Sequence, residues 1–217
     1  MAMTVAEHRN RPLKVLLLIL ALLALVLYSY LVLTGAFKTA SDQVSPSRDS
    51  VESSDVSLWD AYGVALDVVR AQASDVQLVS AATQWRAAAE GQLLAGANTW
   101  SFGFYSQSLG STFDVGVGTG GARIVSETQV WHKPQILVEG EWRKGPQDAI
   151  LIFLAYGGRE FIGEYPDAAV DVHLGATDDD RPVWMIVGVG DQDSAPKVLR
   201  IDAETGTVLL NSFKSGG

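Results

Sequence analysis

The hydrophobic pattern of the chain is dominated by one uninterrupted apolar segment near its start. Residues 15–37 read VLLLILALLALVLYSYLVLTGAF, 23 residues without a formal charge. A helix of this length reaches roughly 34 Å at 1.5 Å per residue, which exceeds the hydrocarbon core of a bilayer at about 30 Å. The pattern therefore predicts a transmembrane helix from Val15 to Phe37, with the lipid bilayer as a partner.

The charges that flank this segment predict its orientation. Arg9, Arg11 and Lys14 lie in the tail 1–14, whereas the residues that follow the segment are mixed in sign. Because an excess of Lys and Arg marks the cytoplasmic side, we expect a single-pass protein of the cytoplasmic membrane, with its N-terminus inside and an extracytoplasmic domain. A cleaved signal peptide ending at Thr34-Gly35-Ala36 is the alternative, although secretory apolar regions are shorter than this one.

The pattern changes abruptly after the apolar segment. Residues 38–57 are rich in Ser and Asp, a composition that buries too little apolar surface to order itself and that predicts a flexible tether. Beyond it, the same order of elements occurs twice, in units 58–140 and 141–217. Near its start each unit has a helix-like segment, at 61–72 and 149–156, which is directly preceded by an acidic residue, Asp60 or Asp148, suited to a helix N-terminus.

Shorter segments with the alternation of half-buried strands follow each helix. In the stretch AVDVHL, for example, Val170, Val172 and Leu174 point to one side, and Asp171 and His173 to the other. The strands that we expect are 76–81, 100–105, 112–118 and 122–127 in the first unit, and 169–174, 183–189, 197–202 and 207–211 in the second. The Ala-rich insert 84–97 predicts one further short helix.

Together these elements predict an α+β fold. One transmembrane helix is followed by two units, each a helix lying across the apolar face of its own antiparallel meander. The recurring unit is too long for a solenoid repeat and suits two copies of a small domain.

The closing hairpin of the second unit resembles a known family. Residues 201–208 read IDAETGTV, which is similar to the closing motif of the PepSY domains, and the first unit keeps only the Thr-Gly turn in VGVGTGGARIV at 115–125. The resemblance implies tandem PepSY-like units in an exported or membrane-anchored protein. It also implies binding and regulation of a partner protein, often a peptidase, and it supplies no catalytic residues.

Composition narrows the chemistry further. The chain has no cysteine, which excludes disulfides, thiolate metal sites and a thiol nucleophile. Residues 38–217 carry 13 Lys and Arg against 24 Asp and Glu, a net charge of −11. A domain this acidic, without a basic stripe, repels nucleic acid, so we expect no nucleic-acid partner.

Motifs for catalysis, cofactors and metals are weak. The histidines beyond the apolar segment are His132, in the stretch VWHKP, and His173, on the polar side of a strand, and no G-x-S-x-G elbow is present. The glycines of 116–121 lack the following helix and Lys that a phosphate loop needs. Asp178–Asp180 lack the spacing of an EF-hand loop, and both this cluster and Asp191-x-Asp193 lie where turns are expected between strands. We therefore predict no catalytic, cofactor or metal residues.

The function that these patterns favour is binding. We expect a membrane-anchored, extracytoplasmic binding or regulatory protein that engages an envelope protein partner, such as a peptidase. Trp131 and Trp142, which lie outside the strand patterns near the junction of the two units, are the candidate partner-binding residues, because exposed Trp is enriched in binding hot spots. The alternatives are an envelope hydrolase with an unrecognised site, which a pocket joining His173 to nearby acids would favour, and a structural assembly subunit.

Overall fold

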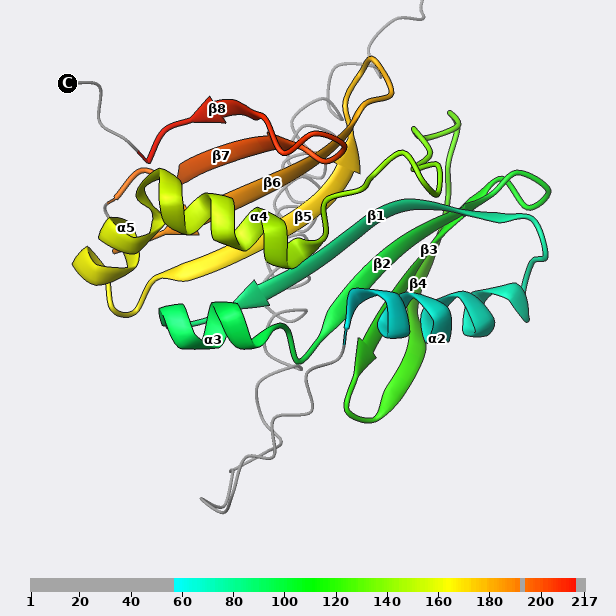
Figure 1. Ribbon diagram of the computed structural model, residues 1–217. Helices are drawn as coiled ribbons and strands as arrows, with labels where there is room; N and C mark the ends of the chain where they lie inside the picture. Colours follow the sequence, from blue (N-terminus) through cyan, green and yellow to red (C-terminus); the bar gives the residue numbers. More distant parts are fainter. Residues whose placement is uncertain (1–56, 192–193, 214–217) are drawn as a thin grey trace, which may run out of the picture. The chain divides into compact units, whose positions relative to one another are not determined.

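The computed structural model describes residues 57–191 and 194–213, which hold eight strands and five helical segments (Figure 1). The helical segments are α2 (Leu58–Arg70), α3 (Glu90–Ala95), α4 (Pro146–Phe153), η1 (Leu154–Gly158) and α5 (Arg159–Glu164). The strands are β1 (Val76–Trp85), β2 (Trp100–Ser106), β3 (Ser111–Gly118), β4 (Gly121–Gln129), β5 (Ala169–Ala176), β6 (Pro182–Val189), β7 (Lys197–Asp202) and β8 (Val208–Asn211). The strand positions predicted from alternation are confirmed, and the Ala-rich insert contains the short helix α3.

Helix α2 shows how local sequence sets these elements. Ser57 caps its N-terminus, because the Ser57 hydroxyl oxygen accepts a hydrogen bond from the Asp60 amide at 3.1 Å. Its apolar residues recur at helical spacing and form one buried stripe: Leu58, Ala61, Ala65, Leu66 and Val69. This stripe packs on β2, β3 and β4, so α2 covers the first half of the sheet.

The eight strands form one antiparallel sheet in the order β4-β3-β2-β1-β5-β6-β7-β8. The two halves of the chain meet where β1 pairs with β5, with Ala81 opposite Leu174 and Trp85 opposite Val170. The other neighbouring strands follow one another along the chain, and among them β1 and β2 are separated by α3. The first strand of each half is therefore central in the sheet.

The predicted fold class is wrong in how it groups these elements. It expected two separate PepSY-like units, 58–140 and 141–217, each with its own meander, whereas both ranges contribute to one sheet within the compact unit Glu52–Gly217. Strands also hold more residues than helices in the described chain. The physical reason is that β1 and β5 would each be an open sheet edge, and pairing them satisfies both rows of backbone groups.

The predicted transmembrane helix, 15–37, lies outside the described residues, as do the tail 1–14 and most of the tether. Among residues 57–191 and 194–213, no helix is both long and apolar enough to cross a membrane. Two predictions are therefore corrected. They are the fold class, which placed such a helix before the domain, and the single-pass localisation with the N-terminus inside. The described structure contains no membrane-spanning helix.

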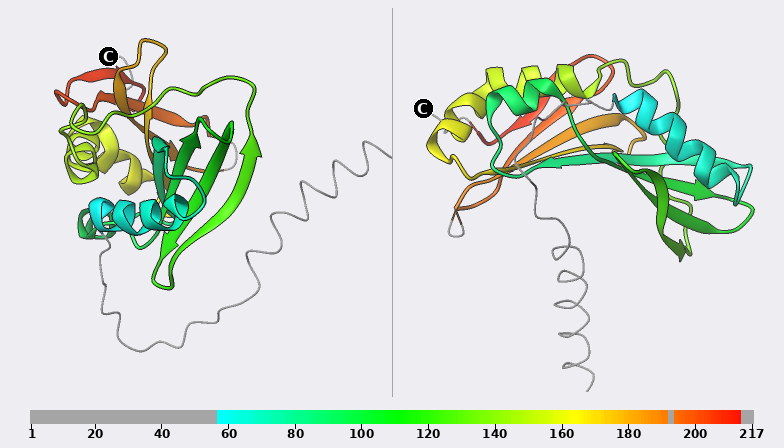
Figure 2. Two further views of the ribbon diagram at one scale, coloured as in Figure 1. Left: turned by 90° about the vertical axis from the view of Figure 1, so that its right-hand side faces the viewer. Right: turned by 90° about the horizontal axis from the view of Figure 1, so that it is seen from below.

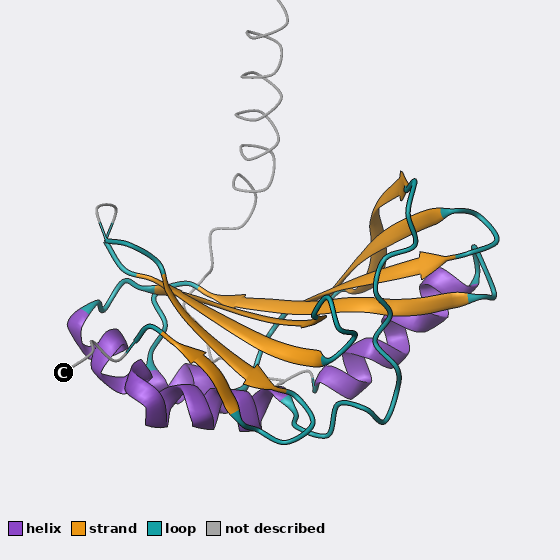
Figure 3. Cartoon of the chain, turned by 90° about the horizontal axis from the view of Figure 1, so that it is seen from above, coloured by secondary structure: helices purple, strands orange, loops and turns teal. Residues whose placement is uncertain are grey.

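All the described helices lie against one face of the sheet, as Figures 2 and 3 show from opposite sides. Side chains that point to this face form the core, among them Phe102, Val172 and Trp184, each at most 1 % exposed. In these views the β3–β4 side of the sheet bends away from the helices and the β7–β8 hairpin bends towards them, while the opposite face of the sheet carries no described helix. We call this opposite face, which no described helix covers, the open face.

Candidate functional site

The open face carries a row of residues that are in register across seven strands. From β4 to β7 the direct cross-strand neighbours are Arg123, Gly116, Ser101, Ala82, His173, Met185 and Arg200. The alternation of burial within each strand places them opposite the helix-covered core. Three central members, Gly116, Ser101 and Ala82, are small, whereas His173 and Met185 beside them are large.

This change in side-chain size coincides with a hollow of about 470 Å³ in the middle of the open face. The hollow spans β1, β2, β5 and β6, and its lining includes Ala82, Gln84, Asp171, His173, Met185 and Val187. Most of the lining surface is carbon. The hollow is open to solvent on one side, so a side chain that projects from another molecule could enter it directly.

His173 is the half-buried titratable group of this hollow. Burial lowers the pKa of its imidazole below the ordinary value of 6.5, so the ring is neutral at pH 7. The ring leans over Gly175, because a Cβ built on Gly175 would lie 2.9 Å from the His173 Cε1 atom. It therefore points along β5 away from Asp171, which lies two residues in the other direction.

Asp171 supplies the carboxylate of the hollow. Its direct cross-strand neighbours are Gln84 on β1 and Val187 on β6. The ion pairs of the described chain are Arg143–Glu204, Arg159–Glu90 and Arg181–Asp179, none of which includes Asp171. The hollow thus brings His173 and an acid together, as the hydrolase alternative required, but without a hydrogen bond between them and without a nucleophile bonded to the imidazole in the described residues.

A second hollow, also about 470 Å³, lies beside the β5–β6 hairpin. Arg181 and Arg200 line it, together with Leu209 and Leu210. Arg181 is engaged by Asp179 at 2.7 Å, where its Nε–H donates to the carboxylate. Arg200 lines this second hollow and does not line the first.

The structure separates the two tryptophans that the sequence proposed as partner-binding. Trp131 is 96 % exposed, in the segment that follows β4, so it is available to a partner. Trp142 is 3 % exposed and stacks on Trp59 with 4.5 Å between ring centroids. Trp142 is therefore a core residue, and its replacement would disturb the fold as well as any binding.

The other candidate motifs form turns and hairpins in the described chain. Asp178–Asp180 lie in the β5–β6 hairpin, where hydrogen bonds from Thr177 and Arg181 lower the pKa of Asp179. The glycines of 116–121 end β3 and turn into β4. No three His, Asp or Glu side chains gather to hold a metal in residues 57–191 and 194–213, and Asp193 lies outside them.

One spacing that the sequence analysis missed is Ser194-x-x-Lys197, a pattern that activates serine in some hydrolases. In the structure the Ser194 hydroxyl donates to the carbonyl oxygen of Asp191 at 2.8 Å. The backbone amide of Ser194 bonds the same oxygen at 3.0 Å, so the residue closes a turn. Its position is that of a structural serine.

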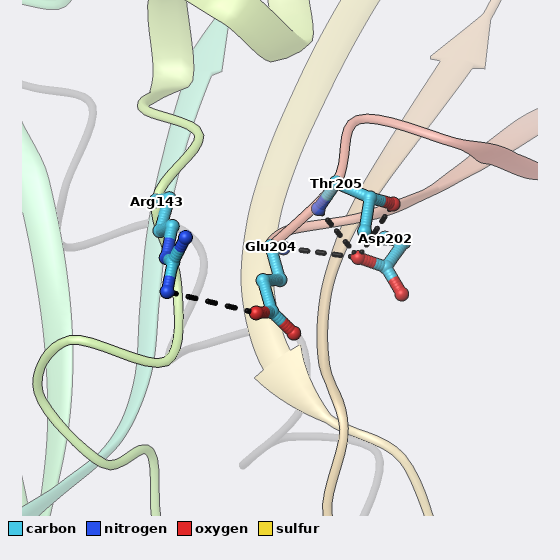
Figure 4. A network of polar contacts seen from close by, with 4 residues as sticks. All are labelled: Arg143, Asp202, Glu204 and Thr205. Carbon is cyan, nitrogen blue, oxygen red and sulfur yellow. Dashed lines mark hydrogen bonds and ion pairs between the residues drawn. The ribbon is translucent and has the colours of Figure 1, made fainter.

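The motif IDAETGTV closes the β7–β8 hairpin by a network shown in Figure 4. The Asp202 Oδ1 atom accepts hydrogen bonds from the backbone amides of Glu204 and Thr205 at 3.0 and 2.8 Å and from the Thr205 hydroxyl at 3.0 Å. The bond from the Thr205 amide contributes most to lowering the pKa of Asp202. The Ala203 carbonyl accepts from the amides of Arg143 and Lys144 at 3.0 and 2.8 Å. The motif thus fastens the segment before α4 to the sheet, which is a structural role.

The signal for the first hollow is only partly present in the sequence. The alternation of β5 places Asp171 and His173 on the side opposite Val170 and Val172, and this was predicted. Which small residues of β1 and β2 line the same hollow depends on strand order and register, and the sequence pattern does not contain that information.

Comparisons with known proteins give little to add to this geometry. No family model matches the chain, and no curated protein matches it. Among solved structures, it is similar to the crystal structure of a candidate lipoprotein from Clostridium difficile 630, with 15 % identity and a TM-score of 0.46, over 72 % of this chain and 91 % of that one. The resemblance of residues 201–208 to the PepSY motif therefore stays a prediction.

Proposed function

We propose that this chain is a binding protein that takes a projecting segment of a protein partner onto its open face. The observation that carries the proposal is the hollow lined by Ala82, His173 and Met185. Its volume of about 470 Å³ falls in the range of about 300–1,000 Å³ typical of ligand sites. An apolar hollow on an uncovered sheet face is the kind of surface that proteins use for association.

The extent of the open face favours a protein as the partner. The row from Arg123 to Arg200 crosses six strand spacings of about 4.8 Å, or roughly 29 Å, which is the scale of a protein footprint. Apolar side chains stay partly exposed on the same face: Val125 (64 %), Met185 (37 %) and Leu210 (48 %). A partner that covers the face would bury all three around the central hollow.

The arrangement of polar groups supports binding over hydrolysis. A hydrolase needs a nucleophile within hydrogen-bonding distance of its base. His173 leans over Gly175, and the Ser101 backbone is separated from that of His173 by the intervening strand β1. A neutral imidazole and a carboxylate that are not bonded to each other are instead available to a guest.

Filling the hollow tests this proposal. We would select peptides that bind the full-length chain from a displayed library of random dodecapeptides and measure their affinity for the Ala82→Phe variant. Ala82 lines the hollow between Ser101 and His173, so a phenyl ring there should weaken binding at least about tenfold. The matched control is Val64→Phe on the outer surface of α2, where Val64 is 46 % exposed, and it should leave the affinity unchanged.

Two results would overturn the proposal. One is a selection that enriches no peptide over the unselected library. The other is a set of binders whose affinity is the same for the parent chain and for Ala82→Phe. Concentration-dependent self-association that Ala82→Phe abolishes would show instead that a second copy of the chain covers the face.

A further inference from the structure

We propose that the guest side chain in the hollow is a lysine or an arginine of the partner. This inference rests on the proposed function and names the chemistry that the hollow recognises. The aliphatic stem of the guest lies against Ala82, Met185 and Val187, and its cationic end reaches Asp171 and the side-chain carbonyl of Gln84. Long basic side chains combine an apolar stem and a charged end in this way.

The lining sets both requirements. Ala82, Met185 and Val187 offer apolar surface on β1 and β6, on either side of β5. Asp171 lies between Gln84 and Val187 in the cross-strand register, so its carboxylate borders the apolar surface. A purely apolar guest would remove water from this carboxylate without replacing its interactions, which costs free energy.

The charges around the hollow favour a cation. Asp171 takes part in no ion pair of the described residues. His173 brings no positive charge at pH 7, since burial keeps its imidazole neutral, and Arg200 lines the second hollow. The domain outside the apolar segment is strongly acidic, at −11 over residues 38–217, and its field attracts basic groups.

An acidic guest would meet the opposite conditions. A Glu or Asp side chain in the hollow would approach Asp171 without a cation in the lining to offset the repulsion. A guest of the size of an aromatic ring would fit the apolar walls but would leave the carboxylate unpaired. A basic side chain satisfies both parts of the lining.

The experiment uses blocked tripeptides and a reporter that the sequence provides. Met185 is the one methionine beyond residue 3, so labelling the methionine methyl groups of the full-length chain with ¹³C gives a signal from the wall of the hollow. The Met185→Leu variant, which lacks this signal, assigns it. The probes are acetyl-Gly-X-Gly-amide peptides in which X is Lys, Arg, norleucine or Glu. Norleucine matches the lysine stem and lacks its ammonium group.

We expect the Lys and Arg peptides to shift the Met185 signal with affinities about threefold to tenfold higher than the norleucine peptide, and the Glu peptide to bind most weakly. Asp171→Asn should reduce the Lys affinity to that of norleucine. The matched control, Asp114→Asn, removes a carboxylate on the same face that lies outside the hollow and is bonded by Ser126, and it should leave the preference intact.

The outcomes separate this inference from the proposal on which it rests. Equal or tighter binding of norleucine, or a Lys preference that survives Asp171→Asn, overturns the inference and leaves the open face as a binding site. Absence of any shift at millimolar peptide also overturns it, while the display selection with Ala82→Phe decides the proposed function independently.

Discussion

At the scale of single residues, Asp75 fastens the β2–β3 hairpin to the turn that precedes β1. Its carboxylate accepts hydrogen bonds from the Ser106 hydroxyl at 2.7 Å and from the Ser108 amide and hydroxyl at 2.7 and 2.9 Å. The bond from Ser106, followed by that from the Ser108 amide, lowers the pKa of Asp75 from 3.8 to about 2. The ionised form is therefore the one that the fold stabilises.

This shift predicts a specific pH dependence of stability. Because the pKa is lower in the folded state, the contribution of Asp75 is fully present above pH 3.8 and is lost as the pH falls towards about 2. Asp75→Asn should lower the free energy of unfolding at pH 5, and the difference from the parent chain should shrink by pH 2. Urea denaturation at the two pH values measures it, and a difference independent of pH would contradict the assignment.

His173 makes a second prediction at this scale, for the proposed guest. Acid protonates the His173 imidazole, whose pKa burial lowers below its ordinary value of 6.5, and this places a cation in the hollow with Asp171. Gln84 and Val187 on the neighbouring strands carry no charge, and Arg200 lines the second hollow. The Lys peptide should therefore bind more weakly at pH 5 than at pH 7.5. His173→Gln should remove most of this change, and the ¹³C-methyl titration of Met185 reports both.

At the scale of elements, the region from α4 to α5 shows what the sequence could predict. The helix-like segment predicted at 149–156 stops directly before the pair Gly157 and Gly158. The structure instead bends at η1, where Gly157 has a φ of 110° and a helix resumes as α5. The glycines correctly indicated a break, because φ values in this range favour glycine. The resumption depends on Phe161, which packs into the core and contacts the ring of Phe213. Phe213 lies 52 residues after Phe161 in the chain, so no local sequence pattern indicates this contact.

Replacing Gly157 tests this bend. A Cβ on Gly157 would lie 3.1 Å from the Phe213 Cβ, and the backbone of an alanine there would be held at a positive φ that L-residues rarely adopt. Gly157→Ala should therefore lower the free energy of unfolding by about 1–2 kcal/mol. The matched control is Gly63→Ala in the interior of α2, where nothing lies within 4 Å, and it should raise that free energy by about 0.5–1 kcal/mol. Two changes of the same sign and size would contradict the interpretation.

At the scale of the whole molecule, the sequence predicted the strands but not their assembly. Alternation of apolar and polar residues is a local property, and it located β5 and β6 well. Which edges pair is decided by contacts such as Ala81 with Leu174, about ninety residues apart in the chain. The open face and its hollow exist only once β1 and β5 are joined, which is why the candidate site could not be derived from motifs.

This joining predicts that both halves unfold together. Val172 on β5 is fully buried and pairs with Thr83 on β1, so Val172→Asp places an unpaired charge in the shared core. If the sheet is one cooperative unit, amide hydrogen exchange should accelerate to a similar degree in β3 of the first half and β6 of the second. Loss of protection in β6 with full protection in β3 would show two independent units, each stable without the other. The hollow would then lack the fixed walls that selective binding of a basic side chain requires.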